Sequence, residues 1–284
     1  MNQKITHYPP GSNWLYLRIY GGPLALEEWL TGSFRLLLNE WIRSDTVLLF
    51  HFVRYLDQDY HLRLRFKLAD PLQSGLLLNL VSSDCRKWIE EERMWKIEAG
   101  TYEPERERYG VERMNLVEEW FYRDSLFWLA ILADANEEEK SVLWKKGAER
   151  IDWMLDRFGF TAEGKLLLLQ RMREALSTEF RVTHRMKSQL DGKYRSISRE
   201  LADAVEKPQT KDADGGKNKI RSVSIIEQIS ETFASRQELE AAGILPDLIH
   251  MSLNRAFRTR HRLQELVMYD FLARYYASAV ARKK

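Results

Sequence analysis

The stretch His61-Leu-Arg-Leu-Arg-Phe-Lys67 decides the fold of the N-terminal part of this 284-residue chain. Its odd positions hold His61, Arg63, Arg65 and Lys67, and its even positions hold leucine and phenylalanine. This alternation predicts a strand that is apolar on one side and cationic on the other. Side chains on one side of a strand lie about 6.5–7 Å apart, so four potential cations repel one another unless they hold an anion. The same pattern also fits a solvated edge face that deters aggregation.

The segments around this strand predict a sheet with two helices. Apolar and aromatic runs predict strands over residues 14–20, 46–55, 61–68 and 93–102. Apolar residues at helical spacing predict helices over residues 24–43 and 71–91. The resulting order β-α-β-β-α-β is the ferredoxin-like pattern. We therefore expect an α+β fold in which residues 1–110 form a ferredoxin-like half.

The chain changes to a helical character after Gly110. Apolar stripes at helical spacing predict helices over residues 112–133, 137–158, 161–190, 222–237 and 245–281. Residues 203–219 are rich in charge and contain Pro208, Gly215 and Gly216, which predicts a mobile loop. We expect residues 111–284 to form a mostly helical half that packs on the sheet, so that the two halves act as one functional domain.

Composition limits the classes of function. Lys and Arg number 44 and Asp and Glu number 42, which gives a formal net charge of +2. A nearly neutral chain is not expected to bind nucleic acid directly or an anionic membrane surface, so any anion recognition should be local. A single cysteine, Cys85, excludes an internal disulfide and a cysteine-rich zinc site. The absence of a signal-peptide core and of a membrane-spanning apolar run favours a cytoplasmic protein.

A second cluster of interest covers residues 101–110, where aromatic, acidic and basic side chains alternate just after a predicted strand. These residues could cap the sheet with surface ion pairs, each of which contributes little stability. Alternatively, Arg106 or Arg108 could reach a substrate carboxylate, with Glu105 holding the arginine in position. The sequence leaves both interpretations open.

A third cluster is the segment 247–255. His250 and Asn254 are four residues apart and therefore share one face of a helix, with Arg255 beside them. His250 lies in an apolar stripe, where a histidine is often structural. It could also act as a general acid or base, because histidine titrates near neutral pH. The six histidines have no metal-ligand spacing, so no metal site is expected.

Five segments in this order resemble the lantibiotic dehydratase C-terminal domain, which eliminates glutamate and is also described as the thiopeptide-type bacteriocin biosynthesis domain. The resemblance covers about residues 14–275. Its motifs are Trp14-Leu-Tyr-Leu-Arg-Ile-Tyr20, Arg54-Tyr55 with His61-Leu-Arg-Leu-Arg-Phe66, Tyr102-Glu-Pro-Glu105 with Arg108-Tyr-Gly110, Phe121-Tyr-x-Asp124-Ser125 and His250-Met-x-x-Asn254-Arg255. Val111 departs from the second glycine that is usual in the family, which changes a turn but removes no functional side chain.

The resemblance implies a stand-alone member that helps to make a ribosomal peptide natural product. In full-length dehydratases of this kind, an N-terminal region transfers glutamate from glutamyl-tRNA to Ser or Thr of a precursor peptide. The C-terminal domain then eliminates glutamate and leaves dehydroalanine or dehydrobutyrine. The expected partners are therefore a precursor peptide, with its leader and glutamylated core, and a separate tRNA-dependent glutamylating subunit. A homodimer is an open alternative to a monomer.

The same resemblance associates elimination with Arg65, Arg108 and His250, and Arg63 is the neighbouring candidate. Elimination removes a proton next to a carbonyl, stabilises the charge that develops and releases a carboxylate. Arginines suit both anionic groups, and histidine suits proton transfer. No metal or redox cofactor is required for this chemistry. We expect further substrate contacts from His61, Tyr102, Glu105, Asn254 and Arg255.

Two other functions remain in view. Some stand-alone members of the family are pyridine synthases, which join two dehydroalanines in a formal [4+2] cycloaddition and close a thiopeptide ring. Those members generally depart from the arginine and histidine set that this chain retains. The alternative without catalysis is a scaffold subunit that binds the leader peptide, for example by adding it as a strand to a sheet edge.

Overall fold

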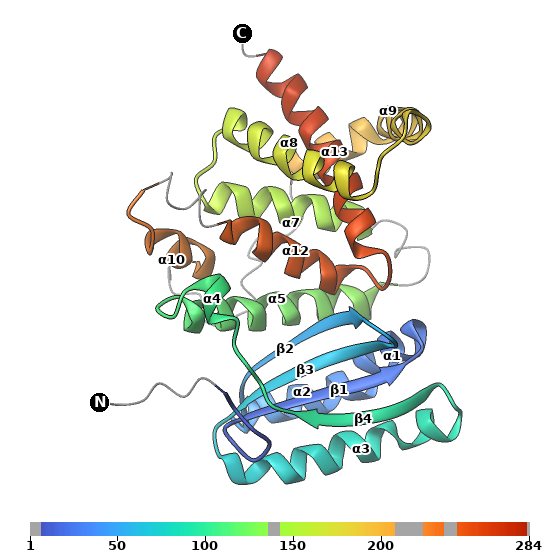
Figure 1. The fold of residues 1–284 in the computed structure, drawn as a ribbon, viewed down its shortest axis with the longest axis vertical. Coiled ribbons are helices and arrows are strands. Elements are labelled where there is room, and N and C mark those ends of the chain that lie inside the picture. Colours follow the sequence, from blue (N-terminus) through green and yellow to red (C-terminus); the bar gives the residue numbers. More distant parts are fainter. Residues whose placement is uncertain (1–6, 136–142, 208–223, 236–242, 283–284) are drawn as a thin grey trace. The chain divides into compact units, whose positions relative to one another are not determined.

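The computed structural model describes residues 7–135, 143–207, 224–235 and 243–282 (Figure 1). These residues divide into two compact units. The described part of the first unit ends at Asp134, and the second unit begins at Ala135. Each unit is described by itself below.

The first unit is a mixed α/β structure built on a four-stranded antiparallel sheet in the order β2-β3-β1-β4. Its strands are β1 (Trp14–Gly21), β2 (Val47–Leu56), β3 (Tyr60–Leu68) and β4 (Met94–Gly100). The helices between the strands are α1 (Pro23–Thr31), α2 (Ser33–Arg43), the 3₁₀ turn η1 (Pro71–Gln73) and α3 (Ser74–Glu90). The alternation of strands and helices follows the predicted order, while the finer ferredoxin-like assignment stays a prediction.

The helix predicted over residues 24–43 is wrong in one respect, because two helices occupy it. Gly32 ends the first with non-helical backbone angles, φ −95° and ψ −111°, and its N–H donates to the carbonyl of Glu28. A Cβ atom at this position would lie 2.8 Å from that same carbonyl oxygen. Only glycine fits so close an approach, so the chain bends here before α2 begins.

The core lies on the helix-covered face of the sheet. The even residues of β3, from Leu62 to Leu68, are all buried in one cluster with side chains of α1, α2 and α3 such as Trp29, Phe34 and Val81. Each large apolar side chain buried in this way contributes about 1.5–3 kcal/mol. Figure 1 shows α1 and α2 behind the sheet and α3 along β4. The strand prediction for residues 61–68 is therefore confirmed, with its apolar side facing the helices.

The helix predicted over residues 112–133 is confirmed as α5 (Met114–Asp134), which follows the short helix α4 (Arg106–Tyr109). It packs along the edge strand β2, where the Phe52 N–H donates to Ser125 Oγ at 3.3 Å. The Phe121 ring lies 5.4 Å from the ring of His51 on the same strand. The contacts group α5 with the sheet. The division predicted at residues 110 and 111, between a sheet half and a helical half, stays a prediction.

The second unit is helical. Its described helices are α7 (Leu143–Arg157), α8 (Ala162–Glu179), α9 (His184–Glu206), α10 (Ile225–Glu231), α12 (Ile244–Ala256) and α13 (His261–Ala281). Two predicted helices, 161–190 and 245–281, are each broken into two. The breaks contain Arg181 and Arg260, both with a positive φ, at 48° and 54°. Of the predicted loop 203–219, residues 203–206 belong to α9 and residues 208–219 lie outside the described residues.

Local capping explains where α8 and α9 begin. The hydroxyl oxygen of Thr161 accepts a hydrogen bond from Gly164 N, and that of Thr183 accepts one from Met186 N. Such caps satisfy backbone donors that the first turn of a helix leaves without partners. The apolar period continues through the break between the two helices, which is why periodicity predicted a single helix. In the described residues no helix combines the length and apolar character needed to cross a membrane.

Candidate functional site

Three arginines share the face of the sheet opposite α1, α2 and α3. Arg63 of β3 lies directly opposite Arg18 of β1, and Arg18 lies opposite Glu98 of β4. One row along, Arg65 lies opposite Tyr16, which in turn lies opposite Gly100. Paired residues, and residues two apart on one strand, point to the same face. The cationic row predicted on β3 is therefore extended by β1 into a patch.

His61 is not a cation in this row, which corrects the count of four. Its side chain is fully buried, and its Nδ1 lies 3.0 Å from the Asp59 carbonyl oxygen while its Nε2 accepts from Arg63 Nε at 3.2 Å. Only the neutral ring with its proton on Nδ1 satisfies both contacts. Burial lowers the pKa of His61 and outweighs the opposing effect of Asp57, whose carboxylate is 3.9 Å away. His61 thus orients Arg63.

Arg63 is further held by an aromatic ring. Its guanidinium carbon lies 3.4 Å from the centre of the Tyr55 ring, a cation–π contact. The residue is half-buried and forms no ion pair with a carboxylate among the described residues. The guanidinium group is therefore positioned by His61 and Tyr55 without being neutralised.

Arg65 has fewer polar partners still. Its guanidinium carbon lies 5.2 Å from the ring centre of Tyr16 and 5.4 Å from that of Tyr102. Its Nε atom is buried and makes no hydrogen bond with any residue that the structure describes. A buried donor without a partner costs about 1–3 kcal/mol, so such donors are rare in the absence of a ligand. Arg65 is the best-defined candidate to bind an anion.

A carboxyl group that sequence reasoning missed lies near Arg65. Tyr102 is buried, and its hydroxyl donates to Glu118 Oε1 at 2.9 Å. Burial raises the pKa of Glu118, and burial together with the Glu118 charge raises the pKa of Tyr102 well above its ordinary value. Glu118 stands between the apolar residues Val117 and Trp120 of α5, and an acid in a buried stripe is the signal that could have found it. Direct substrate contact by Tyr102 stays a prediction.

Arg108 and Glu105 lie in and beside the single turn of α4. Arg108 Nη1 donates to Glu105 Oε2 at 2.8 Å, and both side chains are about half exposed. The pair contributes little stability because water screens it. Glu105 therefore holds Arg108 in the way that the sequence suggested, and the functional role of both remains a prediction. Gly110, with φ 84°, ends this turn in a conformation that favours glycine.

His250 lies on α12 in the second unit and is oriented by a buried acid. Its Nδ1 is 2.7 Å from Oε1 of Glu265, which is only 1% exposed, and Arg262 Nη1 donates to the other oxygen at 3.0 Å. The His250 side chain is 28% exposed, and its Nε2 makes no hydrogen bond within the described part of the chain. An imidazole fixed at Nδ1 by a carboxylate is arranged to exchange a proton at Nε2.

Sequence reasoning missed Glu265 because no local signal distinguishes it. It lies on the next helix, 15 positions from His250, and a glutamate in a helix is ordinarily exposed. Two other predicted contacts are buried in the same unit. Asn254 Nδ2 lies 3.4 Å from His261 Nε2, and Arg255 Nη1 donates to the Met251 carbonyl oxygen. Their burial favours a role in holding α12, and substrate contact by either residue stays a prediction.

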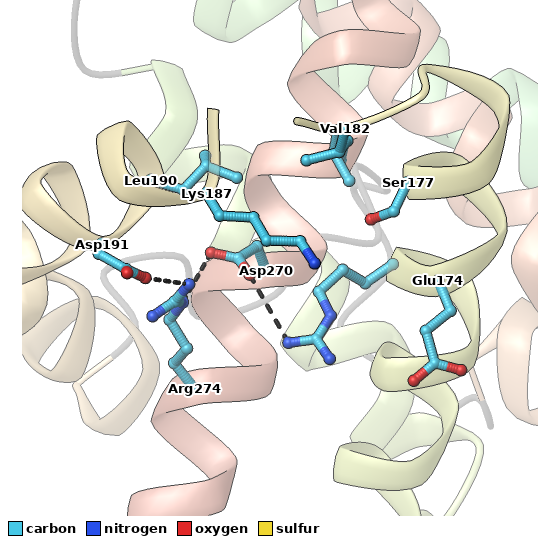
Figure 2. Close-up of a pocket in the computed structure, with 10 residues that line it drawn as sticks. Glu174, Ser177, Val182, Lys187, Leu190, Asp191, Asp270 and Arg274 are labelled. Carbon is cyan, nitrogen blue, oxygen red and sulfur yellow. Dashed lines mark hydrogen bonds and ion pairs between the residues drawn. The ribbon is translucent and has the colours of Figure 1, made fainter. Parts of the chain in front are cut away.

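The second unit also contains a charged pocket of about 390 Å³ lined by α8, α9 and α13 (Figure 2). Arg274 donates to Asp270 at 2.7 Å and pairs with Asp191 at 2.6 Å, and Arg173 lies 3.6 Å from Asp270. These ion pairs link the three helices to one another and use up most of the charge that lines the pocket. The described residues contain no group of three or more side chains suited to a metal ion.

Comparisons with known proteins agree with this fold. The family model described as lantibiotic biosynthesis dehydratase C-term matches residues 14–276. Among solved structures, the chain is similar to MibB, a tRNA-dependent lantibiotic dehydratase from Microbispora sp. 107891, with a TM-score of 0.63, 19% identity and coverage of 96% of this chain. The match spans only 29% of MibB. No curated protein sequence matches.

Two shorter proteins are similar over nearly their whole length. TsrL aligns with a TM-score of 0.62, 12% identity and coverage of 94% of this chain and 95% of TsrL. The pyridine synthase TbtD, from thiomuracin biosynthesis, aligns with a TM-score of 0.59, 13% identity and coverage of 95% and 99%. Identities this low show a shared fold and leave the reaction to be argued from the side chains.

Proposed function

Because the chain belongs to the lantibiotic biosynthesis dehydratase C-terminal family, we propose that it eliminates glutamate from glutamylated Ser or Thr of a ribosomal precursor peptide. The products are dehydroalanine or dehydrobutyrine and glutamate. The observation that carries the proposal is Arg65, a half-buried arginine whose Nε has no hydrogen-bond partner among the described residues. An enzyme that releases a carboxylate needs such a cation.

The reaction assigns a separate task to each group. A base takes the α-proton of the esterified residue, the electron pair forms the Cα=Cβ double bond, and the Cβ–O bond breaks to release glutamate as a carboxylate. Arg63, Arg65 and Arg108 are proposed to bind the glutamyl group and to stabilise negative charge as it develops. No metal or redox cofactor enters the proposal.

His250 is proposed to transfer the proton through Nε2. The Glu265 carboxylate at 2.7 Å holds Nδ1, which leaves Nε2 as the atom that can accept or return a proton. A positioned acid or base of this kind contributes about 10²–10⁴-fold in rate.

The partners follow from the same proposal. The first is a separate tRNA-dependent subunit that glutamylates the precursor. The second partner is the precursor peptide, whose leader and glutamylated core present the substrate. We propose a cytoplasmic location, since both glutamyl-tRNA and the ribosomal peptide are made there, and a homodimer remains an alternative to a monomer.

A pyridine synthase is the second candidate, and one observation favours it. The fold of TbtD, a pyridine synthase, matches 95% of this chain. A formal [4+2] cycloaddition between two dehydroalanines does not release a carboxylate from its substrate. The arginines of the open face and the His250–Glu265 pair therefore favour elimination.

The two functions are separated by supplying two purified peptides. The first is a precursor that already carries a glutamyl ester, and the second is the linear dehydrated precursor. We expect mass spectrometry to show loss of glutamate from the first peptide and no change in the second. His250→Ala should leave the glutamyl ester in place. Macrocyclisation of the second peptide with an unchanged first peptide would establish the synthase instead, and tight leader binding with neither reaction would establish the scaffold.

A further inference from the structure

We propose that Arg18 and Arg65 form a clamp around the Tyr16 ring that binds the side-chain carboxylate of the glutamyl group. The inference rests on the proposed function and names the part of the substrate that the open face of the sheet recognises. A glutamyl group delivered by tRNA is esterified through its α-carboxyl group, so its side-chain carboxylate remains ionised and available for binding.

The sheet brings the two guanidinium groups to one ring from different strands. The guanidinium carbon of Arg18 lies 5.9 Å from the centre of the Tyr16 ring, and that of Arg65 lies 5.2 Å from it. Tyr16 and Arg18 are two residues apart on β1, and Arg65 of β3 is the cross-strand partner of Tyr16. The register of a buried sheet is strongly specified, so these positions are fixed before any ligand binds.

Both arginines have a buried Nε atom that makes no hydrogen bond with the described residues. Arg18 Nε is 3.4 Å from Glu98 Oε2, close enough for an ion pair but without hydrogen-bond geometry. Glu98 already accepts from the Tyr20 hydroxyl at 3.0 Å and from Lys96 Nζ at 2.5 Å. Glu98 is therefore held mainly by the Tyr20 hydroxyl and Lys96 rather than by Arg18.

The like charges on this face also require an explanation. Arg18 and Arg63 are direct cross-strand partners, and like charges in that position repel. A carboxylate bound among the arginines would replace this repulsion by attraction and would satisfy the buried donors. Arginine suits this task because its fork of N–H groups matches the two oxygens of a carboxylate.

Gly100 keeps the space beside the clamp open. It pairs with Tyr16 on β4, and a Cβ atom added there would lie 3.3 Å from Tyr16 Cδ1 and 3.6 Å from Arg18 Nη2. A side chain at this position would therefore stand against the ring and the terminal nitrogen that the ligand needs. A glycine inside a strand marks a close approach of this kind.

The clamp makes a prediction about specificity that elimination alone does not. A glutaminyl ester has the same shape as a glutamyl ester but carries a neutral amide in place of the carboxylate. We expect the wild-type protein to prefer the glutamyl peptide by about 100-fold in kcat/KM, because the paired arginines would otherwise lose a charged partner. Arg18→Met should reduce this preference to less than about fivefold, mainly by raising KM for the glutamyl peptide.

Gly100→Ala tests the open space, and Gly75→Ala is its matched control. A Cβ at Gly75, on α3 of the same unit, would have no neighbour within 4 Å. We expect Gly100→Ala to raise KM for the glutamyl peptide by about tenfold and Gly75→Ala to leave it unchanged. Thermal unfolding of each variant identifies any change that comes from loss of the fold.

Direct binding of glutarate, measured by titration calorimetry, separates this inference from the proposed function. If glutarate binds to the wild type and not to Arg18→Met while no glutamate is eliminated, the clamp stands and the proposed function is wrong. If glutamate is eliminated and Arg18→Met keeps the full preference for glutamyl over glutaminyl peptide, the clamp is wrong and the proposed function stands. Absence of both glutarate binding and elimination overturns both.

Discussion

The arginines on the two faces of the sheet differ in whether an acid of the fold pairs with them. On the helix-covered face, Arg54 of β2 is fully buried and its Nη2 lies 2.7 Å from Oε2 of Glu27, which is also buried. On the open face, Arg65 is half-buried and has no carboxylate within ion-pair distance in the part of the chain that the structure describes. Arg54 is therefore stabilised by an acid of its own fold, whereas Arg65 keeps its donors available for a ligand.

In the charged pocket of the second unit, as on the helix-covered face of the sheet, arginine is paired with acids of the fold. Arg274 lies between Asp191 and Asp270, and these acids come from two different helices (Figure 2). Charge density alone would rank this pocket beside the arginine patch. Because its charges are paired with one another, this pocket holds helices together. The variants below test the difference between paired arginines and arginines available to a ligand.

The largest expected effect is on the covered face. Arg54→Met leaves Glu27 buried without its arginine and should lower the free energy of unfolding by about 3–5 kcal/mol. Urea denaturation measures the loss. The double variant Arg54→Met/Glu27→Leu should recover most of it, since the buried pair is then replaced by apolar side chains. A loss below about 1 kcal/mol in the single variant would remove the contrast between the faces.

On the open face we expect the opposite result, a large loss of activity with little loss of stability. Arg65→Met should lower the rate of glutamate elimination by about 10²–10³-fold, because a donor to the developing carboxylate is lost. Its free energy of unfolding should stay within about 1 kcal/mol of the wild type, since no acid of the fold loses its partner. Single-turnover mass spectrometry and urea denaturation give the two values. A loss of stability as large as that of Arg54→Met would show that Arg65 is structural.

A smaller change in rate is expected at the oriented histidine. Glu265→Gln keeps an oxygen that can accept from His250 Nδ1 but removes the charge, and it should lower kcat by about 10- to 100-fold while KM stays the same. Glu174→Gln, in the pocket of Figure 2, is the control and should leave both constants unchanged. An equal loss in both variants would indicate a general effect on the helical unit.

The smallest effect concerns pH. Burial lowers the pKa of His61 in the folded state, so the unfolded chain binds the proton more readily. Stability should therefore fall as the pH drops through the ordinary histidine value of about 6.5 toward the lowered folded value. His61→Phe should flatten this dependence, which thermal unfolding between about pH 7.5 and 5 would record. Equal slopes for the two proteins would assign the dependence to other groups.

The sequence predicted the sheet better than the helices. Alternation of side chains locates β3 because one slip in register would move Leu62 to Leu68 out of the core. The helical unit was harder, since the apolar period runs through the breaks at Arg181 and Arg260. A positive φ marks both breaks, and a threonine cap begins the helix after the first of them. The break at Gly32 is different, because a glycine within a helical pattern is a signal in the sequence that could have predicted it.

The sequence by itself determined the strand–helix order of the first unit, the face of β3 that carries the cations, and the family. These depend on local periodicity and on motifs that any neighbour in space leaves unchanged. Only the tertiary structure decided which charges are paired. Arg54 and Glu27, or His250 and Glu265, come from separate elements, and their pairing depends on distances that no spacing along the chain encodes. Burial makes His61 neutral, the pair with Glu27 makes Arg54 structural, and Arg18 and Arg65 each keep an Nε donor for a ligand.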